Sequence, residues 1–571
     1  KDQDVVDEIG DEGLGVLIPS DKYQGDDPVF EEDDFSKFVS HPKSQPTSKE
    51  DALKKTRVGI FDNRLEALAF PREFPSGKGS FDSKWKNIKH RNYCQLLMHH
   101  LKDRFRQNRV IPFSLIDRYI KTSMINHARM YVGVTGDKAM VQPKAKDFEN
   151  ANHDVYKRYG SVIASNIPGC KSYWWTKQQE LLAIEKDMGR PPDYFFTCTQ
   201  NDNWPEIQKL IAHGPCGQCD EACDHSADRE PAVDNPVFCS IAFNQRFLEY
   251  RKLAESEVGK IVRFWWRREY QKRGGVHIHG VYWIDPESKK EHPDVVKAEM
   301  PRSTNPDNKE LVNELRSLVL QRQIHDHIPE RCFLRGNKKL TSCKFNFPAP
   351  LVNEVRLDES GIRKLYRRRK EEDKYVLPYS YSLLLVMRCC VNIQEVNDQH
   401  WRQYLPKYIS KEEPTCRVPV SGHPVSKDAS VAEKFLKLKC IGAVEACDII
   451  NNFPLQMSDV EVIYLPTPID EYNTTRTLKR KKHMPPEPES GDVFYSTRFE
   501  KYLDRPEQLN DLTYYEFWKN WTYASRTSNN NEDDPEDETE DVETAERMRD
   551  RNLRWIFKRK NPCVIRVRFI S

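Results

Sequence analysis

The stretch Ile261-Val-Arg-Phe-Trp-Trp-Arg-Arg-Glu-Tyr-Gln-Lys-Arg-Gly-Gly-Val-His-Ile-His-Gly-Val-Tyr-Trp-Ile284 decides the fold. Two runs rich in β-branched and aromatic residues, 262–270 and 276–284, flank a glycine pair. Such runs predict strands, and the short glycine-containing connection predicts an antiparallel hairpin. An earlier run at 194–199 predicts a third strand. We therefore expect an antiparallel sheet.

The second strand of this hairpin carries two histidines, His277 and His279. Alternate residues of a strand face the same side, so both imidazoles project from one face while Ile278 turns to the other. This spacing suits the chelation of one divalent ion, and Glu269 or Gln271 could supply an oxygen ligand from the preceding strand. Either residue could complete the site. The alternative is a half-exposed polar face without a metal.

Two tyrosines, Tyr404 and Tyr408, lie in the segment Trp401-Arg-Gln-Tyr-Leu-Pro-Lys-Tyr-Ile-Ser-Lys411. In a helix, residues four apart share a face. A tyrosine has a pKa of about 10, so it needs a group that stabilises its phenolate, and Lys407 could assist. Pro406 disfavours a helix through the preceding residue, which weakens the shared-face argument for Tyr404. The alternative is a pair of core aromatics.

Basic and aromatic residues interleave in two runs, 263–268 and 366–370. Such runs grip single-stranded nucleic acid through phosphate charge and base stacking. Trp265 and Trp266 of the first run could equally belong to the core. The second run is the stronger candidate, because consecutive cations repel one another without an anionic partner. The predicted DNA contacts are Arg367, Arg368, Arg369, Arg273 and Lys411.

Cysteines and histidines gather in two places, which makes both candidates for structural zinc. The first cluster is Cys216, Cys219, Cys223 and either His213 or His225. The second, with looser spacing, is His325, His327, Cys332 and Cys343. Each would hold a loop-rich segment together and take no part in the chemistry. The alternative is a set of free thiols.

Composition narrows the class of protein. The 571 residues include 90 Lys and Arg against 88 Asp and Glu, so the formal net charge is 90 − 88 = +2. A nucleic acid partner then requires local clustering of basic residues. The sequence contains no run of about 18 apolar residues, so it predicts no membrane-spanning helix. The start lacks the apolar segment of a secretory signal, and the odd count of 15 Cys indicates reduced thiols.

Several motifs together resemble the Rep nuclease region of Helitron transposases, the eukaryotic rolling-circle transposons. Ala67–Gly77 is similar to the family's N-terminal Phe-Pro box, and Phe195–Ile207 to its first nuclease motif. Glu269–His279 resembles its His-hydrophobic-His motif, and Tyr404–Lys411 its two-tyrosine motif. The order of the motifs also agrees. Between the last two follow Cys343–Pro348, Leu365–Arg369, Val376–Tyr379 and Cys390–Gln394.

This resemblance implies an α+β fold with an HUH endonuclease core, a central antiparallel sheet flanked by helices, with additional helical and zinc-binding-like segments. It implies a Mg²⁺- or Mn²⁺-dependent enzyme that nicks and joins single-stranded DNA at transposon ends through a 5′-phosphotyrosine. It also implies residence in the nucleus, no membrane and a helicase domain in the full-length protein, although no phosphate-loop motif occurs here. The alternatives are an inactive end-binding scaffold and a rolling-circle replication initiator.

The expected organisation has four parts. An irregular acidic leader occupies 1–55 and a mainly helical DNA-binding region 56–190, with two helices in 92–131 separated near Arg109–Phe113. The nuclease domain follows at 191–413, with helices near 308–323 and 397–412. A C-terminal extension, 414–571, leads towards the helicase. The sequence leaves the oligomeric state open.

Overall fold

The protein is seen in a computed structural model. It describes residues 62–82, 88–100, 104–108, 110–128, 131–133, 171–208, 235–271, 274–290, 295–303, 306–335, 338–359, 361, 364–396, 441–468, 475–477, 496–523, 547–549, 555–559 and 562–570. The acidic leader and the helix expected near 397–412 lie outside these ranges.

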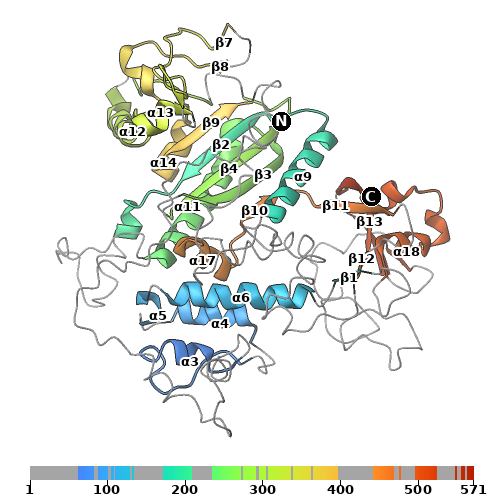
Figure 1. Cartoon of the computed structure of the whole chain (residues 1–571). Coiled ribbons are helices and arrows are strands. Elements are labelled where there is room, and N and C mark those ends of the chain that lie inside the picture. Colours follow the sequence, from blue (N-terminus) through green and yellow to red (C-terminus); the bar gives the residue numbers. More distant parts are fainter. Residues whose placement is uncertain are drawn as a thin grey trace, which may run out of the picture.

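A five-stranded antiparallel sheet forms the centre of the molecule (Figure 1). Its order is β10 (Gln456–Ser458), β3 (Ile261–Tyr270), β4 (Val276–Ile284), β2 (Tyr194–Thr199) and β9 (Val391–Glu395). Every neighbouring pair runs antiparallel. The three strands predicted from the sequence are therefore confirmed, and so is the α+β class.

The predicted hairpin joins β3 to β4 and fixes their register. The Gln271 amide donates to the Gly275 carbonyl (2.9 Å), and Gly274 closes the turn with a φ of 85°. Gly280 lets the sheet pack closely, because a Cβ there would meet the Phe196 ring at 2.3 Å. The resulting register places Glu269 directly opposite His277.

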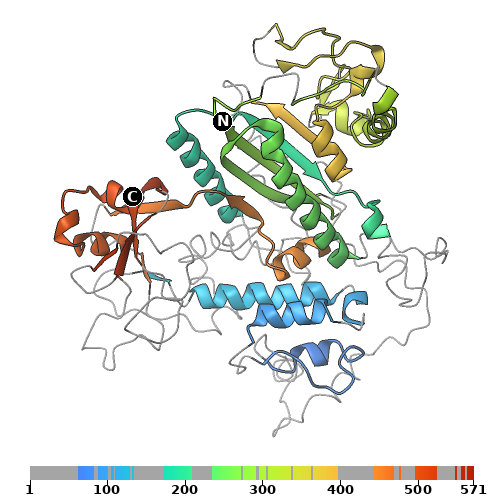
Figure 2. The ribbon, with the colours of Figure 1, turned by 180° about the vertical axis from the view of Figure 1, so that it is seen from behind.

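One face of the sheet packs against three helices. They are α11 (Pro236–Val258), α14 (Tyr381–Met387) and α17 (Ala443–Ile450). Figure 2 shows α11 lying along the sheet. The buried side chains of this core include Phe196, Ile278, Tyr282, Phe243 and Phe247. Burial of such apolar surface is the main stabilising contribution to the fold.

The opposite face is covered by α9 (Lys171–Met188) towards one end of the strands. Leu181 and Ile184 of this helix pack against Trp265, Val281 and Trp283. Because strand residues alternate, Trp265 joins this core while its neighbour Trp266 joins the other. Both tryptophans are buried, so they belong to the core and are not exposed for contact with nucleic acid.

Helices that precede the sheet in sequence pack beneath it. They are α3 (Leu65–Ala69), α4 (His90–Met98), α5 (Arg104–Gln107) and α6 (Ile111–Ala128). Three helices, α4, α5 and α6, thus stand where the sequence predicts two, and α6 begins at Ile111, inside the predicted break. Gln95 of α4 donates to the Ile450 carbonyl at the end of α17 (3.0 Å), which ties this layer to the sheet's helices.

The boundary predicted at residue 413 does not separate the sheet from the rest of the chain. Both α17 and β10 lie beyond it, yet α17 packs on α11 and β10 is an edge strand. The sequence did not reveal this because β10 has only three residues. The other domain boundaries stay predictions.

Two outlying regions complete the described part. Between β4 and β9 lie η3 (Pro306–Asn308), α12 (Lys309–Arg322), α13 (Pro329–Cys332), β5 (Leu334–Arg335), β6 (Lys338–Lys339), β7 (Arg356–Leu357), β8 (Lys364–Leu365) and η4 (Glu371–Tyr375). After β10 come β11 (Val462–Pro468), α18 (Arg498–Leu503), η8 (Glu507–Leu509), α19 (Tyr514–Asn520), β13 (Trp521–Tyr523), β14 (Arg547–Arg549), β15 (Trp555–Lys558) and β16 (Val564–Ile570). Short β1 (Tyr131–Gly133) pairs with β12 (Thr475–Thr477).

The predicted helix at 308–323 is confirmed as α12. Among the helices that the structure describes, none is long and apolar enough to cross a bilayer.

Candidate functional site

The two histidines of β4 lie side by side on the central part of the sheet. The ring centroids of His277 and His279 are 4.4 Å apart, and the rings are nearly perpendicular, at 79°. His277 is half-buried and His279 is 7% exposed. Phe195 of β2 stacks parallel to the His279 ring at 6.0 Å. The sheet therefore holds both imidazoles on one face, as the alternation of the strand predicts.

Glu269 is the oxygen donor that reaches this pair. His279 Nε2 donates to Glu269 Oε2 over 3.1 Å. Burial opposes ionisation of Glu269, but the hydrogen bond from His279 and the positive charges of His279 and Arg267 outweigh it and lower the pKa of Glu269 to about 2. The carboxylate is therefore ionised at neutral pH. The hydrogen bond of the Gln271 main chain instead closes the hairpin.

A buried arginine, Arg267, lies on the same face, directly opposite His279 in the register of β3 and β4. Its side chain is fully buried, and its guanidinium carbon lies 3.9 Å from the ring centroid of Trp174 in α9. A cation over an indole face is held by the ring quadrupole. α9 thus fixes a positive charge beside Glu269. In the sequence, Arg267 belongs to a run of basic and aromatic residues, and nothing in that run indicates its place beside the histidines.

Thr199, at the end of β2, orients the other histidine. Its Oγ1 lies 2.7 Å from His277 Nδ1. When the imidazole donates this hydrogen bond, Nε2 keeps its lone pair, which is the form that binds a metal. Thr199 pairs directly with His277 between the strands. The sequence alone does not indicate this role of Thr199, because the role depends on the register between β2 and β4.

These residues fit a divalent cation by their chemistry: two imidazoles and one ionised carboxylate are the donors of many catalytic sites with open positions. In this structure the carboxylate of Glu269 is engaged with His279 Nε2. An ion at that nitrogen would take the place of its proton, since a ligating imidazole must be neutral.

A second group of metal-binding residues lies between α12 and the loop after β6. The group consists of His325, His327, Cys332 and Cys343. Their possible ligand atoms all lie within 4.8 Å of one another, as in no other group of three or more His, Cys, Asp or Glu among the described residues. His325 Nε2 lies 3.5 Å from the Cys332 sulfur and 3.4 Å from the Cys343 sulfur.

Such spacings agree with a tetrahedral zinc site, in which bonds of about 2.0–2.3 Å separate the donors by about 3.3–3.8 Å. Both sulfurs are buried, and the short hairpin of β5 and β6 connects them. The second predicted cluster thus forms a site that is compatible with a metal ion. The first, Cys216, Cys219, Cys223 and His225, lies outside the described residues.

We expect purified protein to contain zinc bound by this second cluster. The double variant Cys332→Ser/Cys343→Ser should hold one zinc fewer per chain by mass spectrometry and should unfold at lower temperature, because the metal links a loop-rich segment. Cys390→Ser, outside the cluster, is the control and should retain all zinc. An equal zinc content in wild type and double variant would contradict the assignment.

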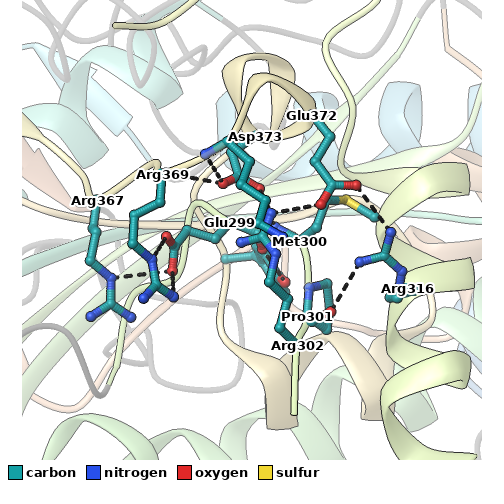
Figure 3. Close-up of polar contacts among 11 residues, drawn as sticks. Glu299, Met300, Pro301, Arg302, Arg316, Arg367, Arg369, Glu372 and Asp373 are labelled. Atoms are coloured by element: carbon teal, nitrogen blue, oxygen red, sulfur yellow. Dashed lines mark hydrogen bonds and ion pairs between the residues drawn. The ribbon is translucent and has the colours of Figure 1, made fainter. Parts of the chain in front are cut away.

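Two arginines of the run 366–370, Arg367 and Arg369, are already paired within the protein (Figure 3). Arg367 Nε lies 3.2 Å, and Arg369 Nε 2.7 Å, from the carboxylate of Glu299. Arg368 is 4% exposed and donates to the main-chain carbonyl of Val376 (2.8 Å). The premise that these cations lack an anionic partner is therefore wrong, and Arg368 is a structural residue that DNA cannot reach.

The charge network extends to neighbouring segments (Figure 3). Arg302 donates to both Glu372 and Asp373 at 2.7 Å, and Arg316 donates to Glu372 at 3.0 Å. Asp373 also accepts the Met300 amide (2.9 Å). DNA contact through Arg367 and Arg369 stays a prediction. Arg273, Lys411, Tyr404, Tyr408 and Lys407 lie outside the described residues.

Comparison with known proteins identifies part of this architecture. Residues 93–282 match the family described as the Helitron helicase-like domain at the N-terminus. The match runs from α4 into β4 and includes both histidines, and it relates the chain to Helitron transposases. No curated protein matches the chain. Residues 93–282, about a third of the chain, are therefore similar to the Helitron helicase-like N-terminal domain.

Proposed function

We propose that this protein is a metal-dependent tyrosine endonuclease and strand transferase of the HUH type, acting on single-stranded DNA at Helitron ends. The observation that carries the proposal is the pair His277 and His279 on the central strand, with ionised Glu269 hydrogen-bonded to it. Together with the Helitron domain match, it favours an active enzyme over an inactive scaffold, for which the imidazole pair would have no use.

His277, His279 and Glu269 would hold Mg²⁺ or Mn²⁺, which supplies charge stabilisation at a phosphate oxygen. Thr199 keeps His277 in the tautomer with a free Nε2. Arg267 favours the ionised form of Glu269, and Trp174 holds Arg267 in place. The chain's own groups thus present the lone pair of His277 Nε2 and the negative charge of Glu269 on one face of a rigid sheet, and His279 Nε2 would add a second lone pair once an ion displaces its proton.

The reaction we propose is a transesterification. The phenolate of Tyr404 or Tyr408 forms a bond to phosphorus, the bond from phosphorus to the 3′-oxygen breaks, and that oxygen takes up a proton. Lys407 would stabilise the phenolate. The product is a 5′-phosphotyrosine with a free 3′-hydroxyl. Attack by a 3′-hydroxyl on the same phosphorus breaks the bond to the tyrosine and joins the strands, while the partner tyrosine can attack a second strand.

Arg367 and Arg369 are the described residues that we assign to the DNA backbone, with Arg273 and Lys411 as further contacts. Arg369 keeps 49% of its side chain exposed despite its bond to Glu299, so a phosphate can approach it. We also propose that the protein acts in the nucleus, together with a helicase domain of the full-length polypeptide.

The test is formation of a covalent adduct. Wild-type protein, incubated with Mn²⁺ and a labelled single-stranded oligonucleotide, should give a protein–DNA band that survives denaturation. The band should disappear with chelator and in the double variant Tyr404→Phe/Tyr408→Phe, because phenylalanine has no nucleophile. The single variants identify the tyrosine that attacks first. A band that persists in the double variant would disprove the tyrosine mechanism.

A further inference from the structure

We propose that Asn392 and Gln394 of β9 form a subsite that reads the base of a nucleotide flanking the scissile phosphate. This inference rests on the proposed function and adds a specificity determinant to it. Both residues lie on the same face of the sheet as the histidine pair, and both are half-buried.

The register places this subsite next to the chemistry. Thr197 of β2 pairs with His279 on one side and with Asn392 on the other. Neighbouring strands are about 4.8 Å apart, so the main chains at His279 and Asn392 are separated by about 10 Å. A strand of DNA that crosses the sheet from the histidine pair towards β9 would place an adjoining nucleotide over Asn392 and Gln394.

The side chains that line this path are uncharged. Thr197, Thr199, Asn392 and Gln394 follow the histidines across β2 and β9. The nearest carboxylate along β9, Glu395, alternates to the other face and is paired with Lys364. No negative charge on β2 or β9 at these face positions would therefore repel a phosphate, while amide groups suit the edges of bases.

The two amides hold each other in a defined orientation. Gln394 Nε2 donates to Asn392 Oδ1 over 2.8 Å. Within the described part of the chain, no further hydrogen bond uses Asn392 Nδ2 or Gln394 Oε1. A donor and an acceptor thus remain side by side. Adenine presents the complementary pair, because its N7 accepts and its N6 amino group donates. The predicted preference at this position is adenine.

The experiment uses oligonucleotides in which each position flanking the cleaved phosphate carries A, C, G or T in turn. Wild-type protein should cleave and bind the adenine version about 10-fold better than the others at one position, as a bidentate amide–adenine contact allows. Asn392→Ala and Gln394→Ala should each reduce this ratio to about 2-fold or less, while cleavage of the other three versions stays near wild type.

Two controls separate this inference from the proposed function. Gln321→Ala, on exposed α12, should keep the full ratio. His277→Ala should lose nicking but keep the adenine preference in binding, measured by fluorescence anisotropy. If wild type binds with this preference yet does not nick, the proposed function fails and the subsite stands. The subsite is disproved if wild type shows no base preference or if Asn392→Ala and Gln394→Ala keep that preference. It is also disproved if these variants weaken binding and cleavage of all four oligonucleotides equally.

Discussion

Replacing His277 by alanine is expected to abolish metal-dependent nicking while leaving the fold largely intact. The imidazole is half-buried on the face of β4, and its removal leaves the core side chains of the other face in place. Loss of the proposed metal ligand would remove several kcal/mol of transition-state stabilisation, at about 1.4 kcal/mol for each factor of ten in rate. The nicking rate should therefore fall by about 1000-fold.

The measurement is the initial rate of cleavage of a single-stranded oligonucleotide in Mn²⁺, with the melting temperature as a check on folding. His99→Ala, an exposed histidine directly after α4, is the matched control and should nick normally. Thr199→Val tests the positioning of His277. It should lower the nicking rate by about 10–100-fold, because a metal ligand loses its hydrogen-bond partner. A higher concentration of Mn²⁺ should partly restore the nicking rate of Thr199→Val. Unchanged nicking by His277→Ala would refute the metal assignment.

The substitution Asp448→Ala is expected to have the largest effect on stability. Asp448 of α17 and Arg268 of β3 form a fully buried ion pair at 2.9 Å. The carboxylate also accepts the hydroxyls of Tyr270 (2.7 Å) and Ser240, while Arg268 donates to Asn244 (2.7 Å). Removing one member leaves a buried guanidinium without its counter-ion, which costs about 3–5 kcal/mol.

Urea unfolding measures this change as a shift of the midpoint at constant slope. The control is Glu249→Ala, which breaks an exposed pair with Lys252 on α11 and should cost less than about 1 kcal/mol. A loss of less than about 1 kcal/mol for Asp448→Ala would show that the buried network does not hold α17 against the sheet.

Local patterns predicted the elements that the chain specifies over short distances. Strands β2, β3 and β4 could be read from runs of β-branched and aromatic residues, and their hairpin from the glycine pair. The shared face of His277 and His279 followed from alternation alone. The group around Cys332 and Cys343 was found from its residue types, although its sequence spacing is loose.

Long-range pairing was beyond those patterns. Thr199 and Arg267 lie in motifs that assign them no role beside the histidines, and Trp174 lies in none. Only the alignment of β2, β3 and α9 brings the three residues to the histidines. The arginine run illustrates the opposite error. Its charge indicated an external anion, whereas Glu299, about seventy residues away, neutralises two of its members and burial removes a third.

The sequence by itself determined the sheet-forming hairpin, the imidazole pair on one face and the mixed α+β character, because alternation and turn chemistry act between residues close in the chain. Only the tertiary structure decided that Glu269 hydrogen-bonds to His279, that β10 joins the sheet from far downstream, and that Arg268 forms a buried ion pair with Asp448. Those contacts arise when burial forces distant charged and polar groups to find partners, and no local pattern encodes which partner is near.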